Sequence, residues 1–238
     1  TFLSVAPKLA TFAALARVFG AIFPLAAYDL TALFAVIAAL TMTIGNFTAM
    51  FQTDVKRLLA YSSIAQAGYL MIGLAVGTPL GREGVLLYSF VYVAMNIGAF
   101  AVAQAVGSAK GSYDLSAFDG LSKRHLGLAL SMTFCLLSLA GIPPLAGFMG
   151  KLFIFSSAVE AGQWWLAVVG VLNSVASVYY YFQIARRMFL REPADEAAIS
   201  VGAYVYGSVA AAVAGVLLFG VYPEPLIAGV RASTQILP

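Results

Sequence analysis

The fold is decided by the stretch Gly141-Ile142-Pro143-Pro144-Leu145-Ala146-Gly147-Phe148-Met149-Gly150-Lys151, which lies inside an uncharged segment, Leu126 to Val159, whose only charge is Lys151. A straight membrane crossing needs about 20 apolar residues, so this segment is too long for one unbroken helix. Proline lacks an amide donor and clashes with the preceding helical turn. In lipid such a break survives only where protein or water covers the freed backbone groups. We therefore predict a discontinuous membrane helix from Leu126 to Ala158, broken at Gly141 to Pro144.

A buried amine beside a broken helix indicates a site of ion or proton transfer. The alternative is that the lysine extends its ammonium to the membrane surface and serves only as an anchor. Lys151 is therefore the first candidate site residue, and these two interpretations remain open at this point.

The composition is typical of a multi-pass membrane protein. Of the 238 residues 62% are hydrophobic and 10% are charged, whereas soluble domains carry about 25% charged residues. The net charge of +3 comes from basic residues scattered over short loops, which argues against nucleic-acid binding. The single cysteine, Cys135, excludes an intramolecular disulfide and a cysteine metal cluster, and the single histidine, His125, excludes a multi-histidine site within the chain.

Windows free of charge predict seven membrane spans in one all-α transmembrane domain covering residues 1–238. We expect the connections Gly107 to Arg124 and Phe189 to Ala198 to be solvated. The sequence opens within an apolar run, and we expect it to be the C-terminal part of a longer subunit. The predicted spans are Thr1 to Val18, Leu30 to Phe51, Leu58 to Val76, Gly84 to Val106, the broken span Leu126 to Ala158, Gln163 to Ile184 and Val201 to Val221.

Charges at the ends of these spans predict the orientation. One side holds eight basic residues, among them Lys56, Lys123 and Arg187, and the other side holds three, Arg17, Arg82 and Arg231. Because basic residues favour the cytoplasmic side, the eight face the cytoplasm and the C-terminus faces outward. We expect a bacterial inner (plasma) membrane location.

A second lysine, Lys8, follows Pro7 within the first span, nine residues before Arg17. The separation is about 13 Å along a helix, which places Lys8 inside the hydrocarbon. There the charged amine is disfavoured, and a lysine can take up and release a proton. The alternative is that its depth is misjudged at the ragged start of the sequence.

Polar side chains recur on single helix faces and add candidates for a proton path. They can hold water between titratable groups, or they can join helices by hydrogen bonds worth about 0.6 kcal/mol each. Lys56 stands at a predicted cytoplasmic turn, where topological anchoring is the alternative to proton entry. The three stripes are Ser62, Gln66 and Tyr69; Ser89, Tyr92 and Asn96; and Asn173, Ser177 and Tyr181. The further candidates for the proton path are Gln66, Tyr69, Asn96, His125 and Lys56.

Two motifs occur in the chain, in this order: Gln52-Thr-Asp54-Val-Lys56-Arg57-Leu-Leu-Ala-Tyr61-Ser-Ser-Ile-Ala-Gln66-Ala-Gly-Tyr69 and Ser138-Leu-Ala-Gly141-Ile-Pro143-Pro144-Leu-Ala-Gly-Phe-Met-Gly150-Lys151. They resemble the antiporter-like subunits of respiratory complex I, NADH:quinone oxidoreductase, and the likeness extends over essentially the whole chain. Within that family the stretch from Tyr92 to Phe100 most resembles the subunit N branch, because related branches tend to carry His and Lys where Asn96 and Phe100 stand. Gln66 departs from the pattern, since relatives often have His there, so a relay at this position is altered or uses water.

The resemblance implies the C-terminal half of a fourteen-helix subunit, with residues 30–190 forming the second of two inverted five-helix repeats. It implies that Lys8 and Lys151 transfer protons, driven by quinone reduction in other subunits. Flavin, iron–sulfur clusters and quinone would belong to partner subunits, with no cofactor and no redox chemistry in this chain. The implied partners are the other membrane subunits of complex I, including neighbouring antiporter-like subunits, and the lipid bilayer.

Two other functions remain open. One is a subunit of a multi-subunit cation/proton antiporter or a membrane-bound hydrogenase. The other is a membrane scaffold that transports nothing and whose lysines pair with a neighbour. A hydrated path between Lys8 and Lys151 separates a pump from a scaffold, and copurification with flavin and iron–sulfur subunits separates complex I from an antiporter.

Overall fold

The computed structural model describes residues 2–22, 30–193, 199 and 201–234, and every element named within these ranges is a helix. The predicted start of the first span at Thr1 lies outside the described residues. The helices are α1 (Phe2–Ile22), α2 (Thr31–Met50), α3 (Val55–Val76), α4 (Pro79–Lys110), the 3-10 helix η2 (Leu115–Phe118), α5 (Leu121–Arg124), α6 (Leu126–Ala140), α7 (Ala146–Glu160), α8 (Trp164–Leu190), α9 (Ala203–Val221) and α10 (Glu224–Thr234).

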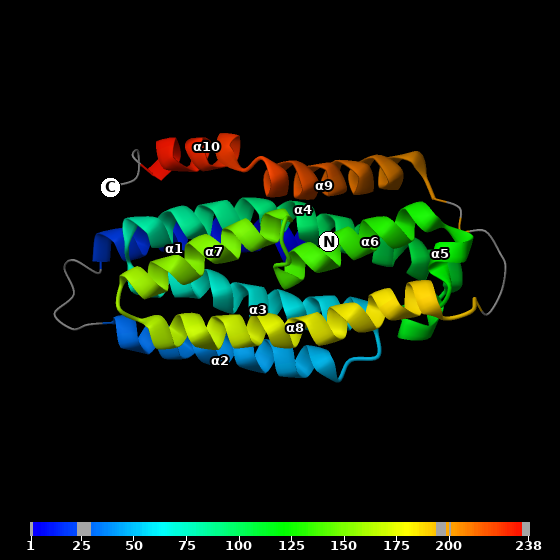
Figure 1. Cartoon of the computed structure of the whole chain (residues 1–238), viewed down its shortest axis with the longest axis horizontal. Coiled ribbons are helices and arrows are strands. Elements are labelled where there is room, and N and C mark those ends of the chain that lie inside the picture. Colours follow the sequence, from blue (N-terminus) through cyan, green and yellow to red (C-terminus); the bar gives the residue numbers. More distant parts are fainter. Residues whose placement is uncertain (1, 23–29, 194–198, 200, 235–238) are drawn as a thin grey trace.

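The long helices run side by side along the longest axis of the molecule (Figure 1). α4 lies at the centre and contacts α1, α3, α6, α7, α9 and α10, while α2 packs on α3 and α8. α9 and α10 follow each other along one side of the bundle, and α2 and α8 lie along the opposite side. α3, α4, α6 and α7 lie between these two sides.

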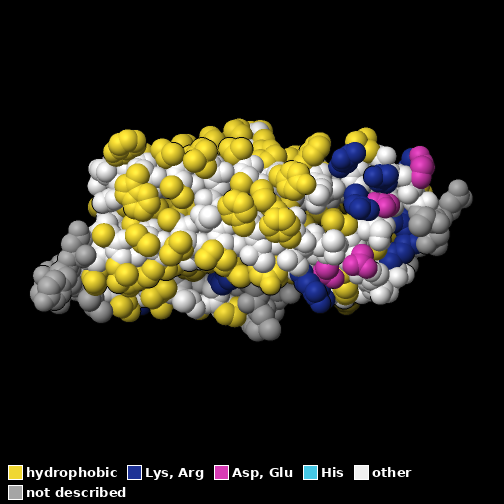
Figure 2. Space-filling model, turned by 90° about the horizontal axis from the view of Figure 1, so that it is seen from below, with side chains coloured by type: hydrophobic (Ala, Val, Ile, Leu, Met, Phe, Trp, Pro, Cys, Tyr) yellow, Lys and Arg dark blue, Asp and Glu magenta, His cyan; other side chains and the backbone are white. Residues whose placement is uncertain are grey.

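The bundle has the dimensions and surface of a membrane domain. Among the described helices, α2, α3, α4, α8 and α9 are each long and apolar enough to cross a membrane. α6 and α7 have 15 residues each, too few to cross alone, and together they form one further crossing. Figure 2 shows hydrophobic side chains covering most of one face and charged side chains gathered at one end, where α5 lies. The chain is therefore an all-α, multi-pass membrane bundle.

The predicted break between Gly141 and Pro144 is confirmed, because α6 ends at Ala140 and α7 begins at Ala146. Two predicted spans are shorter than the helices that contain them. α4 runs from Pro79 to Lys110, beyond both ends of the predicted span, and α8 extends to Leu190, beyond the predicted end at Ile184. A span predicted from charge-free windows ends at the first charged residues. The helix itself continues into the aqueous layer as long as its backbone is hydrogen-bonded. α10 was not predicted, because its 11 residues are too polar for a span and too short for a domain.

The connection from Gly107 to Arg124 was expected to be solvated, and this expectation was wrong for its central part. It carries η2 and α5, and Leu115, Phe118 and Leu121 are buried. The apolar side chains at intervals of three residues anchor the connection to the bundle. Residues 194–198 of the other connection lie outside the described residues.

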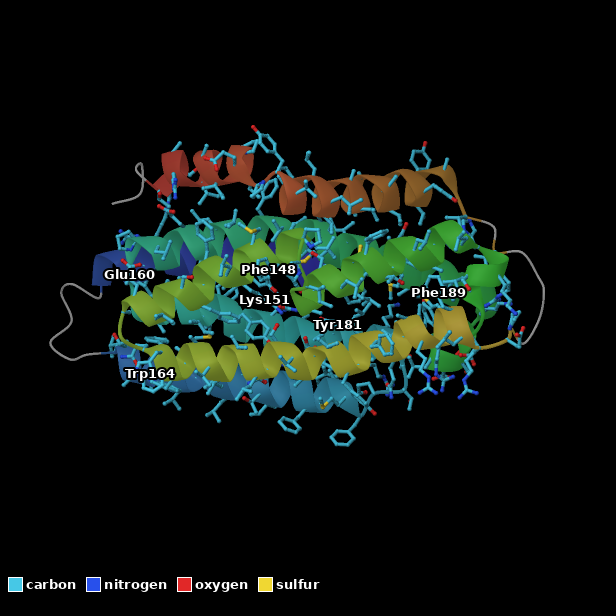
Figure 3. The ribbon with its side chains drawn as sticks, in the orientation of Figure 1. Phe148, Lys151, Glu160, Trp164, Tyr181 and Phe189 are labelled. Atoms are coloured by element: carbon cyan, nitrogen blue, oxygen red, sulfur yellow. The ribbon has the colours of Figure 1, made fainter. Side chains whose placement is uncertain are left out.

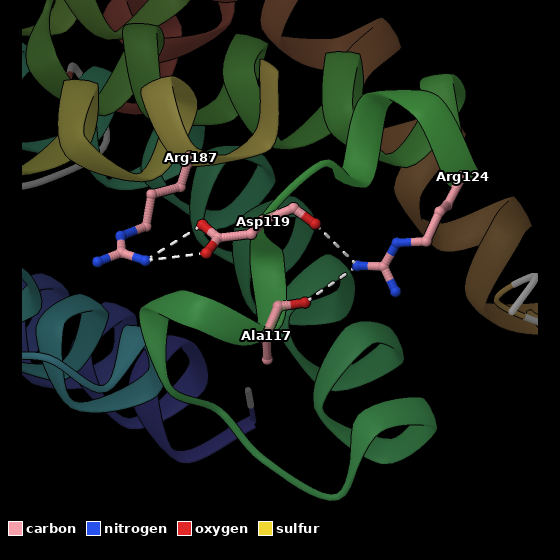
Figure 4. A network of polar contacts seen from close by, with 4 residues as sticks. All are labelled: Ala117, Asp119, Arg124 and Arg187. Atoms are coloured by element: carbon pink, nitrogen blue, oxygen red, sulfur yellow. Dashed lines mark hydrogen bonds and ion pairs between the residues drawn. The ribbon is translucent and has the colours of Figure 1, made fainter. Parts of the chain in front are cut away.

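Polar contacts tie this connection to α8 (Figure 4). Arg187 Nη1 donates to both carboxylate oxygens of Asp119 at 3.1 Å, and Arg124 Nη2 donates to the carbonyl oxygens of Ala117 and Asp119 at 3.2 Å. Both bonds come from one guanidinium nitrogen, and hydrogen bonds between charged groups are stronger than those between neutral groups. This network closes the charged end of the bundle.

Candidate functional site

The break between α6 and α7 is shaped by glycine. Gly141 follows the last residue of α6 with φ +86°, a left-handed conformation that ends helices and suits glycine. Its N–H donates to the carbonyl oxygens of Leu137 (3.1 Å) and Ser138 (2.9 Å). On the other side of the break, the N–H of Gly147 donates to Ser138 Oγ at 3.0 Å. These bonds hold the two half-helices together across the break.

Lys151 replaces the amide donors that the two prolines lack. In an unbroken helix the carbonyl oxygens of Leu139 and Ala140 would accept from the N–H groups of residues 143 and 144, and proline has no N–H. Lys151 Nζ donates to these two oxygens, at 2.8 Å for Leu139 and 3.1 Å for Ala140. The ammonium therefore satisfies backbone groups that the break would leave exposed in the membrane interior.

The surroundings of Lys151 stabilise a positive charge. Its side chain is buried, with 3% exposed, and it lies midway along the bundle in Figure 3. The C-terminus of α6 carries the negative end of the helix dipole. Lys151 Nζ also donates to Ser174 Oγ at 2.9 Å and lies 4.6 Å from the centre of the Tyr69 ring, and an aromatic face attracts a cation.

Gln66 connects Lys151 to the tyrosines of the bundle interior. Its Nε2 donates to the carbonyl oxygen of Leu139 at 3.1 Å, the same oxygen that accepts from Lys151. Gln66 Nε2 also donates to Tyr181 OH at 3.3 Å, and Gln66 Oε1 accepts from Tyr88 OH. All four of these side chains are buried. The shared carbonyl makes Gln66 and Lys151 direct neighbours.

Lys8 reaches the same interior from α1. The half-buried side chain donates from Nζ to the carbonyl oxygen and to Oγ of Ser63. Ser63 Oγ is hydrogen-bonded to Tyr92 OH at 2.7 Å. The rings of Tyr92 and Tyr88 lie with centres 6.5 Å apart, one helical turn apart on α4. Lys8 and Lys151 are thus the two ends of one row of polar side chains, which we call the polar row: Lys8, Ser63, Tyr92, Tyr88, Gln66 and Lys151.

A second polar group lies beyond Tyr69, between α2, α3 and α8. Asn46 Nδ2 donates to Tyr69 OH (3.1 Å) and to Asn173 Oδ1 (3.0 Å), and Asn46 Oδ1 accepts from Tyr180 OH (2.8 Å). Asn173 Nδ2 in turn donates to Thr43 Oγ1 at 3.1 Å. This group fixes the hydroxyl of Tyr69 and so the ring that faces Lys151.

Two of the predicted path residues lie at the charged end of the bundle, far from Lys151. His125 caps α6: its Nδ1 accepts from the N–H of Leu128 at 3.3 Å, and its ring packs on Tyr206. Lys56 is exposed in the first turn of α3, and its Nζ lies 4.1 Å from the centre of the Tyr113 ring. His125 lies fourteen residues before Leu139, about 21 Å along α6. Lys56 lies seven residues before Ser63 and ten before Gln66, about 10 Å and 15 Å along α3.

Asn96 is buried on α4, one helical turn beyond Tyr92. Of the predicted residues, the contacts given above bring together Lys8, Gln66, Tyr69 and Lys151.

Sequence reasoning missed four residues of the site: Ser63, Tyr88, Ser174 and Asn46. Tyr88 lies four residues before Tyr92, a spacing that places both on one face of a helix, and this signal could have found it. Ser63 and Ser174 are short hydroxyl side chains without such a pattern. Asn46 is the one amide side chain between Leu30 and Phe51, and an amide in an apolar span indicates an interhelical contact.

Comparisons with known proteins agree with this architecture. Residues 1–177 match the family described as NADH:quinone oxidoreductase/Mrp antiporter, TM. A protein of Heliobacterium modesticaldum named NADH-quinone oxidoreductase subunit N is 46% identical over 226 residues, covering 94% of this chain and 48% of that protein. A protein of the same name from Trichlorobacter lovleyi is 44% identical and covers 99% of this chain and 49% of that protein. The chain spans about half the length of the curated relatives it matches.

Solved structures show the same fold. A chain of respiratory complex I from Thermus thermophilus is 33% identical with a TM-score of 0.71, over 82% of this chain and 44% of that one. A chain of an archaeal membrane-bound sulfane sulfur reductase is 28% identical with a TM-score of 0.87, over 95% and 46%. A chain of the Mrp complex from Dietzia, at 22% identity and a TM-score of 0.79, over 87% and 47%, shares the fold.

Proposed function

Because this chain belongs to the NADH:quinone oxidoreductase/Mrp antiporter membrane family, we propose that it is part of a proton-translocating membrane subunit of NADH:quinone oxidoreductase. The single observation that carries the proposal is the polar row, in which the ammonium groups of Lys8 and Lys151 are joined by hydroxyl and amide side chains through an apolar bundle. A scaffold subunit has no need for such a row. A pump needs buried groups that exchange protons.

In this proposal Lys8 and Lys151 load and release protons, and the other members of the row hold the path between them. The Ser63 hydroxyl can accept from Lys8 and donate to Tyr92. When Lys151 is protonated, the carbonyl oxygens of Leu139 and Ala140 accept its hydrogen bonds. A change of charge near either lysine alters the free energy of its protonated form and drives transfer along the row.

Two steps of the path require water. Tyr88 OH donates to Gln66 and Tyr92 OH is bonded to Ser63, so transfer between the two hydroxyls takes place through a bridging water. The amide of Gln66 is neither an acid nor a base near neutral pH, so a proton passes it on water while Gln66 orients the neighbouring hydroxyls. The path is a row of fixed polar groups that supports a short water chain.

Family membership and the charge bias of the loops support the remaining parts of the proposal. Redox cofactors and quinone belong to other subunits of the complex, and this chain contributes proton transfer within a bacterial plasma membrane. Residues 30–190, which contain α2 to α8, correspond to the second five-helix repeat. The end of the bundle that carries Lys56, Lys123 and Arg187 faces the cytoplasm, and the C-terminus faces outward.

The proposal is tested in the assembled complex with the full-length subunit. Lys8→Ala and Lys151→Ala should each depress proton pumping, followed with a pH-sensitive dye in vesicles during NADH oxidation. Lys123→Ala is the matched control, because it removes a lysine that pairs with Glu192 (2.6 Å) on the exposed charged end. Assembly is checked by native electrophoresis. Full pumping in both alanine variants would overturn the proposal.

The orientation is tested by labelling. Lys123→Cys should react with an impermeant thiol reagent only from the cytoplasmic side, and Glu160→Cys, at the opposite end of the bundle, only from outside. The reverse pattern would contradict the orientation. Cys135 is buried and serves as an internal background measurement.

A further inference from the structure

The junction between α9 and α10 is a second helix break, on the outer side of the bundle. α9 ends at Val221 and α10 begins at Glu224, with Pro223 and Pro225 on either side of the glutamate. Neither proline can donate the amide hydrogen bond that the carbonyl oxygens of Phe219 and Val221 would accept in a continuous helix. The junction therefore combines freed backbone carbonyls with an acidic side chain.

This junction lies at the depth of Lys151. Leu226 of α10 and Phe153 of α7 pack against the same cluster, formed by Leu87, Ile227 and Val230. Glu224 lies two residues before Leu226, and Lys151 lies two residues before Phe153. Since α7 and α10 run in the same direction (Figure 1), Glu224 and Lys151 lie at similar depth.

Two further contacts agree with this depth. A Cβ added at Gly220 of α9 would lie 2.7 Å from Leu145 Cα, next to the break between α6 and α7. Arg231, seven residues after Glu224, pairs with Glu83 at 3.3 Å. This pair lies about 10 Å nearer the end of the bundle than Glu224. Glu224 is thus the acidic side chain of α10 that lies deep in the membrane layer.

The side chains at the junction face outward. Val221 is 72% exposed, Tyr222 is 59% exposed, and Glu224 is exposed. Within the part of the chain that the structure describes, Glu224 has no ion-pair partner. Charged side chains at this depth pair with one another or line water-filled cavities, and irregular backbone in the membrane is covered by protein or water. A hydrocarbon surface satisfies neither requirement.

The break between α6 and α7 shows what kind of group can meet these two requirements. There an ammonium donates to the two carbonyl oxygens that prolines have freed. At the outer junction the additional carboxylate of Glu224 strengthens the preference for a cation. We propose that the face formed by Val221, Tyr222 and Glu224 docks a membrane helix of a partner subunit that presents a lysine or arginine at mid-membrane depth. The proposal rests on this chain acting within a membrane complex.

The test places a photoreactive benzophenone amino acid at Tyr222 in the full-length subunit within the purified complex. After illumination, we expect a covalent adduct with a membrane helix of another subunit, mapped by mass spectrometry to a position within one turn of a Lys or Arg. In a Glu224→Ala background the yield of this adduct should fall several-fold or be lost. In the matched Glu160→Ala background, which removes an exposed glutamate at the end of α7, the yield should not change.

Adducts with lipid alone, or with a helix that has no cation near the mapped position, would overturn the proposal. An unchanged yield in Glu224→Ala would overturn it as well, because the carboxylate would then contribute nothing to docking. If the Glu224→Ala variant assembles poorly, the crosslink mapped in the complex that retains Glu224 still tests the proposal. Copurification of the subunit with the complex tests the proposed function separately from the docking face.

Discussion

Lys151 Nζ donates a 2.8 Å hydrogen bond to the carbonyl oxygen of Leu139, and so supplies the bond that Pro143 cannot. The helix break and the buried lysine are therefore parts of one device. The break provides acceptors that stabilise the charged amine, and the amine makes the break tolerable in the membrane interior. A change in the charge of Lys151 therefore alters the hydrogen bonds at the end of α6. It also affects Gln66, which donates to the same carbonyl oxygen of Leu139.

Replacing Gln66 should interrupt the polar row without removing a charge. Gln66→Ala leaves Tyr88 OH and Tyr181 OH without their amide partner, and an unsatisfied buried polar group costs about 1–3 kcal/mol. The loss also removes the group that orients these hydroxyls toward the path. If this adds about 1.4 kcal/mol to the barrier for proton transfer, pumping should fall roughly tenfold. Gln66→His should retain or raise pumping, because an imidazole can carry a proton.

The control for Gln66 is Gln104→Ala, which removes an exposed amide at the charged end of the bundle. Equal pumping by Gln66→Ala and Gln104→Ala would show that proton transfer does not depend on Gln66.

The ring of Tyr69, rather than its hydroxyl, should matter for Lys151. Tyr69→Phe keeps the aromatic face 4.6 Å from Nζ and loses only the bond from Asn46, about 0.6 kcal/mol for a bond between membrane helices. Its pumping should be close to that of the wild type. Tyr69→Leu removes the ring as well, and its pumping should drop clearly. If both variants pump equally, the contact between cation and ring has no role.

Gly141→Ala tests the geometry of the break. A residue other than glycine in the left-handed region costs about 1–2 kcal/mol, and the added Cβ would also lie 2.9 Å from Lys151 Cδ. Gly162→Ala is the matched control, because Gly162 has φ +74° and open space around it. Thermal unfolding of the purified complex should show a larger loss for Gly141→Ala, together with reduced pumping. Equal losses would mean that Lys151 tolerates the displacement.

The sequence was sufficient to predict the break and the membrane bundle, because proline chemistry and an absence of charge act locally. It also singled out Lys8, Lys151, Gln66 and Tyr69, which the fold brings together. Hydrogen bonds between side chains far apart in the sequence could not be predicted in this way. Ser63 meets Lys8 across 55 positions in the sequence and Asn46 meets Asn173 across 127, and nothing near a serine or an asparagine specifies its partner.

His125 and Lys56 show the converse. Each has chemistry suited to proton transfer, but His125 caps the start of α6 and Lys56 lies in the first turn of α3, so helix length separates them from the polar row. Residue type alone could not place them. α10 was missed because its 11 residues are too polar and too few for a membrane span, and the packing of Ile227 and Val230 on Leu87 of α4 is a long-range contact.

The most direct measurement of the central claim is proton pumping by the complex that carries Lys151→Arg, compared with Lys151→Ala and Lys151→His. If Lys151 loads and releases a proton, arginine should fail although it is a cation, because a guanidinium stays protonated. Alanine should fail too, and histidine should restore part of the pumping, since imidazole titrates near neutral pH. All three variants should assemble, because Gln66 Nε2 and Ser174 Oγ still donate to the carbonyl oxygens of Leu139 and Ala140. Full pumping by Lys151→Arg would contradict proton transfer at this residue and leave it as a fixed positive anchor of the broken helix.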